Sequence, residues 1–292
     1  MADPAPKESV EGAPARRTGP GRMLGADLRA RVGAAVALMA GALATAWAGG
    51  CWFSSFWLIA ALVVHWEWQR LIGGPNQGLR VLCGSAGLVA AAPLAINGAV
   101  LWAVAALLIG AAGAAFASGT KPPRLMSGAG VFYAGAMLVS VCLLRASSSG
   151  GLYAILWLFA VVWATDVMAF FGGRLVGGPK LWPRLSPAKT WSGFSIGILC
   201  GAAAGLLAAP AANSIFALFC FGLATGAVAQ GGDLLESALK RRFGVKDSSR
   251  LIPGHGGLLD RLDGFVAAAI STAFVGAARY GVVNMAAGVF QW

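Results

Sequence analysis

The residues of this chain that could carry out chemistry are concentrated between Ser237 and Asp263. This segment combines acids, lysines, arginines, glycines and one of the two histidines, whereas the sequence on either side is mostly apolar. Charged side chains within or beside membrane spans are unfavourable, and they mark places that bind something charged. The segment is therefore the first candidate for a functional site.

Two acidic helix faces flank this segment. Before it, four polar residues follow the spacing i, i+3, i+4 and i+7 of one helical face: Asp233, Glu236, Ser237 and Lys240. After it, Asp260 and Asp263 share a face at the start of the next helix. Acids at that position can simply favour the helix dipole. Two acidic faces at one membrane surface also suit Mg²⁺, which takes one or two carboxylates plus substrate phosphates, and we expect a magnesium site there.

A glycine-rich loop joins the two faces. Its glycines would let backbone N–H groups approach a polyphosphate, and nearby cations would neutralise the charge. The residues concerned are Gly254, Gly256 and Gly257 for the backbone, and Lys246, Arg250 and Arg261 for the charge. His255 either donates a hydrogen bond to a leaving phosphate or bonds within the loop, and the sequence leaves both open. The loop matches neither a Walker A motif nor a dinucleotide-binding fingerprint.

A second polar cluster lies upstream. Asp166 stands inside an apolar run, where an acid is a functional candidate by default, with Arg174 as a possible partner. The alternative is a buried structural hydrogen bond. Lys189, with Ser186 and Thr190 beside it, is typical of a phosphate-binding group.

Composition indicates an integral membrane protein. The chain is 58% hydrophobic and 11% charged, with mean hydropathy +0.73, whereas about 25% of residues are charged in soluble domains. Long apolar runs predict an all-α, polytopic fold. The net charge of +11 does not indicate nucleic acid, because the sequence has no basic patch with interleaved aromatic residues.

The other histidine, His65, lies in the run His65-Trp66-Glu67-Trp68. Its aromatic neighbours favour the interpretation that it has a structural role at the membrane interface.

We expect about nine transmembrane helices, over residues 32–49, 51–70, 79–96, 98–118, 125–145, 151–172, 192–210, 213–235 and 264–287. All but two of the 22 Lys and Arg residues, Arg145 and Arg279, then fall in the N-terminal segment and the even-numbered connections. By the positive-inside rule, the N-terminus and the loops that carry the candidate site face the cytoplasm.

The same pattern divides the chain into three parts. Residues 1–28 are expected to form a disordered, basic cytoplasmic tail. Residues 29–150 hold the N-terminal transmembrane helices. Residues 151–292 form a catalytic transmembrane region with two long cytoplasmic loops.

The two polar clusters together resemble the phosphatidate cytidylyltransferase (CDP-diacylglycerol synthase) family. The family's C-terminal signature runs S-x-apolar-K-R-x4-K-D-x-small-x2-apolar-P-x-H-G-G-apolar-x-D-R-apolar-D, and this chain fills every fixed position. The matching residues are Ser237, Lys240, Arg241, Lys246, Asp247, Ser249, Ile252, Pro253, His255, Gly256, Gly257, Asp260, Arg261 and Asp263. The segments around Asp166 and Lys189 are similar to the family's D-x-x-A-Y/F-x-x-G-R and S-P-x-K-T-x-E-G elements. One departure is Ser192, where the family usually has Glu.

The resemblance implies an enzyme of the cell inner membrane, often a homodimer. Such an enzyme transfers CMP from CTP to phosphatidic acid, and it yields CDP-diacylglycerol and pyrophosphate with Mg²⁺, alone or with a second cation. The lipid phosphate is already an anionic nucleophile, so catalysis requires positioning and charge neutralisation rather than a Ser-His-Asp arrangement.

From the residues and the resemblance together we expect three groups of site residues. The catalytic group is Asp233, Lys240, His255, Asp260 and Arg261. The substrate-binding group is Arg174, Ser186, Lys189, Thr190, Ser237, Arg241, Lys246, Asp247, Gly256 and Gly257. The metal-binding group is Asp166, Asp233, Glu236, Asp260 and Asp263.

Two alternatives remain open at this point. Another CTP-dependent lipid enzyme, such as an ether-lipid CDP synthase or a polyprenol kinase, would share the nucleotide residues and differ in the lipid site. An ion-coupled transporter would use Asp166 and Asp233 as ion sites and would show matching polar interruptions in two repeated halves. The acids instead concentrate after residue 160, which disfavours the transporter.

Overall fold

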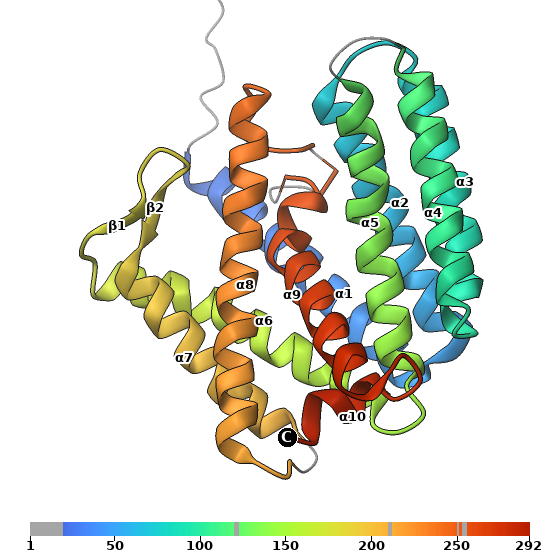
Figure 1. Ribbon diagram of the computed structural model, residues 1–292. Helices are drawn as coiled ribbons and strands as arrows, with labels where there is room; N and C mark the ends of the chain where they lie inside the picture. Colours follow the sequence, from blue (N-terminus) through green and yellow to red (C-terminus); the bar gives the residue numbers. More distant parts are fainter. Residues whose placement is uncertain (1–19, 120–122, 210–211, 250, 253–255) are drawn as a thin grey trace, which may run out of the picture.

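The computed structural model describes residues 20–119, 123–209, 212–249, 251–252 and 256–292. These ranges form a bundle of α-helices with one small β-hairpin at its side (Figure 1). His255 and Arg250 of the predicted site lie outside the described residues, as do residues 1–19 of the expected tail.

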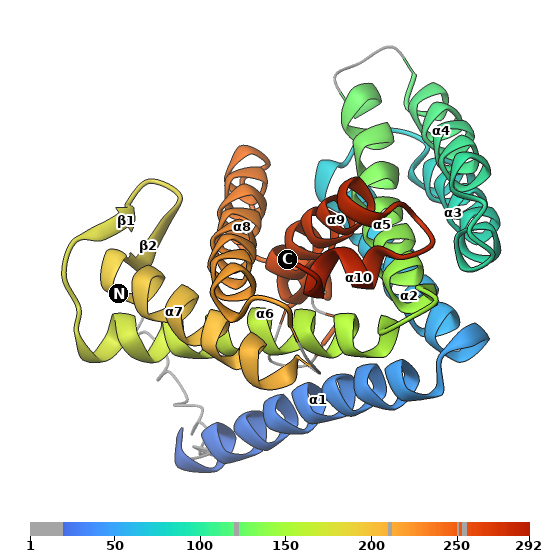
Figure 2. The ribbon, with the colours of Figure 1, turned by 60° about the horizontal axis from the view of Figure 1, so that its bottom comes forward.

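The N-terminal half contributes five helices: α1 (Pro20–Ala48), α2 (Gly50–Ile72), α3 (Gln77–Ile96), α4 (Val100–Ala117) and α5 (Pro123–Ala146). Helices α2 to α5 pack together on one side of the bundle, while α1 crosses to lie along α6 (Figure 2). Helix α1 includes residues 20–28, which belong to the stretch for which we expected disorder.

The C-terminal half carries the predicted site. Its elements are α6 (Gly151–Leu175), β1 (Lys180–Trp182), β2 (Ser186–Thr190), α7 (Trp191–Ala208), α8 (Ile215–Arg242), α9 (Leu259–Tyr280) and α10 (Met285–Phe290). We expected a single last helix over residues 264–287. Helix α9 instead begins at Leu259 and is followed by Gly281, whose φ of 74° ends it before α10.

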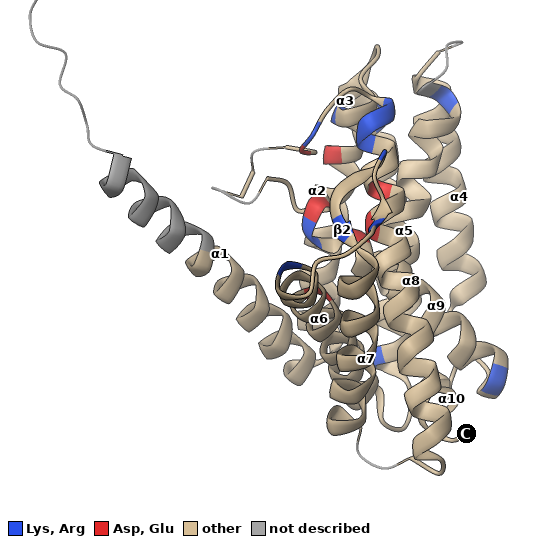
Figure 3. Ribbon diagram, turned by 90° about the vertical axis from the view of Figure 1, so that its left-hand side faces the viewer, with Lys and Arg blue, Asp and Glu red and all other residues tan. Residues whose placement is uncertain are grey.

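Within the described residues, seven helices are long and apolar enough to cross a membrane, namely α3 to α9. Helix α1 contributes a shorter apolar stretch, Val32–Ala48, and α2 carries polar residues in its last turns. The all-α, polytopic fold is confirmed, whereas the count of nine spans stays a prediction. Figure 3 shows the acidic residues, with much of the basic charge, toward one end of the bundle.

A buried aromatic cluster fixes the helix that supports the site. Trp57 of α2 stacks on Phe265 of α9, with ring centroids 4.8 Å apart, and on Phe159 of α6 at 6.2 Å. All three side chains are buried. Stacked aromatic pairs add specific geometry to the hydrophobic effect, so this cluster holds α9 against both α2 and α6.

Helices α6 and α7 approach through small residues. A Cβ atom added to Gly193 would lie 2.6 Å from the backbone oxygen of Ala169, and one added to Gly197 would lie 2.8 Å from that of Thr165. Such close approach between membrane helices requires glycine at the contact. It places Asp166, one residue after Thr165, beside the start of α7 and the end of the hairpin.

Candidate active site

A polar cleft of about 700 Å³ lies among α6, the hairpin, α7, α8 and α9. Four acids line this cleft: Asp166 from α6, Asp233 from α8, and Asp260 and Asp263 from α9. Four cations line it as well: Arg174, Lys180, Lys189 and Arg261. The two polar clusters of the sequence therefore meet in one place. In particular, Asp233 and Asp260 line the same cleft.

A tight contact between α8 and α9 brings the central acids together. A Cβ atom on Gly232 would lie 2.6 Å from the backbone oxygen of Asp263, and one on Gly264 would lie 2.9 Å from that of Ala229. The two glycines are the direct neighbours of Asp233 and Asp263. The carboxylates of Asp263 and Asp166 lie close enough to Asp233 for their charges to repel. This concentration of negative charge favours a bound cation.

Lys189, in strand β2 of the hairpin, forms an ion pair with Asp233. Strands β1 and β2 pair antiparallel, with Lys180 opposite Thr190. Lys189 Nζ lies 2.6 Å from Asp233 Oδ2 and donates a 3.0 Å hydrogen bond to Gln230 Oε1. The sequence analysis did not single out Gln230. A polar residue that follows an apolar run, three positions before Asp233, is a signal that the sequence does contain.

Thr190 and Ser192 shape the end of the hairpin. Thr190 Oγ1 accepts a 3.1 Å hydrogen bond from the backbone N–H of Gly193 and so caps α7. Ser192 Oγ lies 3.0 Å from Thr190 Oγ1 and donates to the backbone oxygen of Gly177. The serine that replaces the family's usual Glu thus fastens the preceding loop to α7. Ser186 lies in β2, outside the lining of the cleft.

Lys240 is held between two carboxylates. Its Nζ lies 2.6 Å from Glu236 Oε2, as an ion pair without hydrogen-bond geometry, and 3.0 Å from Asp260 Oδ1. Asp260 also accepts from the backbone N–H groups of Ser248 at 3.0 Å and Gly257 at 2.9 Å. Among the described residues that line the cleft, neither Glu236 nor Lys240 is present. These two predicted site residues therefore lie outside the lining and reach the cleft only through the contact of Lys240 with Asp260.

The sequence analysis missed one acid entirely. Glu67 of α2 is fully buried and accepts hydrogen bonds from the backbone N–H groups of Leu258 at 3.0 Å and Leu259 at 2.6 Å. It also accepts from the hydroxyls of Ser249 at 2.5 Å and Ser248 at 3.3 Å. The rule that marks Asp166 as an intramembrane acid applies equally to Glu67. Of the run His65-Trp66-Glu67-Trp68 we considered only His65, and assigned it a structural role.

The remaining predicted residues lie in the last turns of α8 or in the segment between α8 and α9. Ser237 donates to Asp233 Oδ1 at 3.4 Å. Gly256, with φ of 80°, lies against the Asp260 carboxylate, and Gly257 lies against Glu67. Three others are exposed and lie outside the lining of the cleft: Arg241, Lys246 and Asp247.

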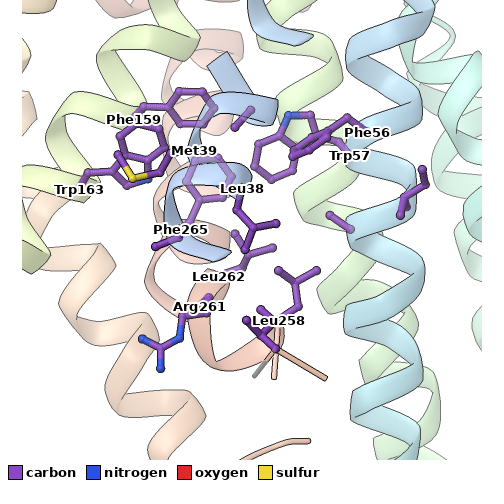
Figure 4. A pocket seen from close by; sticks show the side chains of 15 residues that line it. Leu38, Met39, Phe56, Trp57, Phe159, Trp163, Leu258, Arg261, Leu262 and Phe265 are labelled. Carbon is purple, nitrogen blue, oxygen red and sulfur yellow. The ribbon is translucent and has the colours of Figure 1, made fainter. Parts of the chain in front are cut away.

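An apolar groove of about 270 Å³ adjoins the cleft. Helices α1, α2, α6 and α9 form it, with aromatic side chains such as Phe56, Trp57 and Trp163 gathered at one end (Figure 4). Arg261 lies at the other end, next to Leu258 (Figure 4). Arg261 lines both the groove and the polar cleft, so the two cavities meet at this residue.

Comparison with known proteins agrees with this arrangement. A family model described as the cytidylyltransferase family matches residues 29–278. The chain belongs to the cytidylyltransferase family. Relatives named phosphatidate cytidylyltransferase from Brucella abortus (strain 2308) and Brucella suis biovar 1 (strain 1330) are 42% identical over 247 residues, which are 83% of this chain and 91% of each relative. A protein of the same name from Staphylococcus haemolyticus (strain JCSC1435) is 45% identical over 124 residues, 41% of this chain and 48% of that protein.

This family membership confirms the resemblance drawn from the signature. It also directs attention to the acids as ligands of a divalent cation. Within the described residues, no three His, Cys, Asp or Glu side chains converge in the arrangement of a metal site. The donor chemistry nevertheless fits a hard cation, because four carboxylates from three helices line the cleft of this cytidylyltransferase-family protein.

Proposed function

We propose that this protein is a phosphatidate cytidylyltransferase, which transfers CMP from CTP to phosphatidic acid. The observation that carries the proposal is the junction at Arg261, where a charged cleft and an apolar groove meet. A reaction between a nucleoside triphosphate and a phospholipid needs one polar and one apolar binding region side by side. The names of the relatives from Brucella agree with this choice.

The cleft suits the nucleotide. Its cations Arg174, Lys180 and Lys189 would neutralise a triphosphate. The four acids of the cleft, Asp166, Asp233, Asp260 and Asp263, would supply carboxylate oxygens to Mg²⁺. The ion would compete with Lys189 for Asp233 and with Lys240 for Asp260. A bound Mg²⁺ would supply charge neutralisation on the phosphates.

The groove suits the lipid. It is lined almost entirely by carbon, and ligand pockets usually measure roughly 300–1,000 Å³, so this smaller space would receive the part of an acyl chain next to the headgroup. The rest of the chains would stay in the bilayer. Arg261 would then lie where the lipid phosphate enters the cleft.

The reaction is an in-line substitution at phosphorus. An oxygen of the lipid phosphate forms a bond to the α-phosphorus of CTP, and the bond from that phosphorus to the bridging oxygen of the β-phosphate breaks. The electron pair leaves with pyrophosphate. The nucleophile is already anionic, so the residues of the cleft need only position both substrates and offset their negative charge.

The direct test uses purified protein with Mg²⁺, phosphatidic acid and CTP carrying a radioactive label on the α-phosphate. We expect the label in chloroform-soluble lipid, and no transfer when the label is on the γ-phosphate. Transfer of the γ-label to a polyprenol would instead identify a kinase. Asp233→Asn should abolish α-label transfer while the protein still elutes as a folded species in size-exclusion chromatography, and wild-type turnover in that variant would refute the assignment of Asp233.

The homodimer, the inner-membrane location and the cytoplasmic orientation of the loops stay predictions. Crosslinking of tagged copies would test the first. Protease accessibility in vesicles of known orientation would test the other two.

A further inference from the structure

Glu67 connects two distant parts of the chain. It lies near the end of α2, and its carboxylate meets the segment between α8 and α9 about two thirds of the chain later, across 191 positions to Leu258. Four donors reach its two oxygens: two backbone N–H groups and two serine hydroxyls. Between residues 32 and 150, Glu67 is the one acidic residue in the sequence.

The contact with Glu67 provides an acceptor for backbone N–H groups at the start of α9, which have no partner within the helix. The first N–H groups of a helix have no partner within it and need an acceptor from elsewhere. Leu258 is the residue before α9 and has no side-chain cap of its own, so Glu67 supplies the acceptor from another helix. A negative charge at a helix N-terminus is also favourable electrostatically.

The fit around Glu67 is close. A Cβ atom on Gly257 would lie 2.7 Å from Glu67 Oε1 and would also collide with the Ser248 hydroxyl. Glycine at position 257 therefore lets the loop approach the carboxylate. The second glycine of the His-Gly-Gly run is thus required by Glu67, whatever role the backbone has toward phosphate.

The first turn of α9 also carries the residues that face the cleft. Asp260, Arg261 and Asp263 follow within four positions of Leu259 and line the cleft. Fixing the backbone at Leu258 and Leu259 fixes the direction in which these three side chains project. We propose that Glu67 is a positioning residue, which sets the loop and the first turn of α9 for the reaction without touching the substrates.

This inference rests on the proposed function, and its test keeps the two apart. Glu67→Gln preserves the size of the side chain but turns an NH₂ group toward N–H donors. We expect kcat/KM for CTP to fall about 10- to 100-fold, the loss typical when a residue that orients a site is removed. The KM for phosphatidic acid should rise as well, because Arg261 projects from the same first turn of α9. Glu67→Asp keeps the charge with a shorter reach and should recover part of the loss.

Gln69→Met is the matched control. Gln69 lies on the same helix, is equally buried, and exchanges hydrogen bonds with Ser127 of α5 at 2.9 Å. Gln69 does not line the cleft, and its two hydrogen bonds go to Ser127 rather than to the described part of the loop. Its loss should lower thermal stability to a similar degree and leave kcat/KM for CTP within about threefold of wild type.

A second measurement does not depend on activity. Limited trypsin digestion after Lys246, followed through a C-terminal tag, reports how firmly the loop is held. Cleavage at Lys180, in the exposed hairpin, provides an internal reference. Cleavage after Lys246 should accelerate in Glu67→Gln and not in Gln69→Met.

The experiments distinguish a failure of the inference on Glu67 from a failure of the proposed function. Wild-type kinetics and wild-type cleavage in Glu67→Gln would overturn the inference, as would equal kinetic losses in both variants, which would mark Glu67 as merely structural. If wild-type protein transfers no CMP, the proposed function fails. The digestion would then still decide whether Glu67 holds the loop.

Discussion

Replacing Lys240 with Met removes one positive charge from between two buried carboxylates. The side chains of Glu236 and Asp260 are 2% and 8% exposed. Lys240 forms an ion pair with each of them. Asp260 keeps its backbone donors at Ser248 and Gly257, whereas neither oxygen of Glu236 accepts a hydrogen bond from the described residues. Glu236 should therefore account for most of the damage.

The magnitude follows from this burial. Breaking a buried ion pair by removing one partner costs about 3–5 kcal/mol, because the other charge stays uncompensated. A loss of 1 kcal/mol lowers the melting temperature by about 2–4 °C in domains of 150–250 residues. Lys240→Met should therefore lower the melting temperature by at least about 6 °C. Adding Glu236→Gln removes the stranded charge, so the double variant should be more stable than Lys240→Met alone.

Thermal unfolding in detergent, followed by fluorescence-detected size-exclusion chromatography, measures both effects. The same samples are assayed for CMP transfer. If the double variant recovers stability without activity, Lys240 acts in the reaction as the sequence predicted. If it recovers both, the role of Lys240 is structural. A fall below about 2 °C in the single variant, or no gain in the double variant, would refute the reasoning from burial.

Three further outcomes test other parts of the structure. Gly232→Val should reduce the rate of CMP transfer at least about tenfold, because the new side chain would meet the backbone of Asp263 and separate α8 from α9. Ala60→Phe should raise the KM for long-chain phosphatidic acid about tenfold by filling the groove, and leave the KM for CTP unchanged, while the exposed Ala90→Phe serves as control. Thr190→Ala should lower the free energy of unfolding by about 1 kcal/mol, since its hydroxyl caps α7, and thermal unfolding measures this.

Each of these expectations has a result that contradicts it. Normal transfer by Gly232→Val would mean that the contact between α8 and α9 does not position the acids. Equal lipid kinetics in Ala60→Phe and Ala90→Phe would remove the groove from the lipid site. An unchanged melting temperature in Thr190→Ala would show that the cap contributes nothing to stability.

The class of the protein and the segments that hold its candidate site follow from the amino-acid sequence alone. Apolar runs of sufficient length predict membrane helices because the hydrocarbon core excludes unpaired backbone groups. The i, i+3 and i, i+4 spacings correctly placed Asp233 and Ser237 on one face of α8, since partners within one helix depend on helical periodicity alone. The family followed from the spacing of the signature for a similar reason, because it lies within one continuous stretch.

Contacts between side chains of different helices and strands could be identified only from the three-dimensional structure. It paired Lys189 with Asp233 and joined Glu67 to the start of α9. It also placed Arg261 where the cleft and the groove meet. These contacts depend on how closely helices approach, which small residues such as Gly232 permit but do not specify. Helical periodicity predicts which residues of one helix lie on the same face. The distances between side chains of different helices and strands, on which the chemistry of the site depends, are set by how these elements pack together.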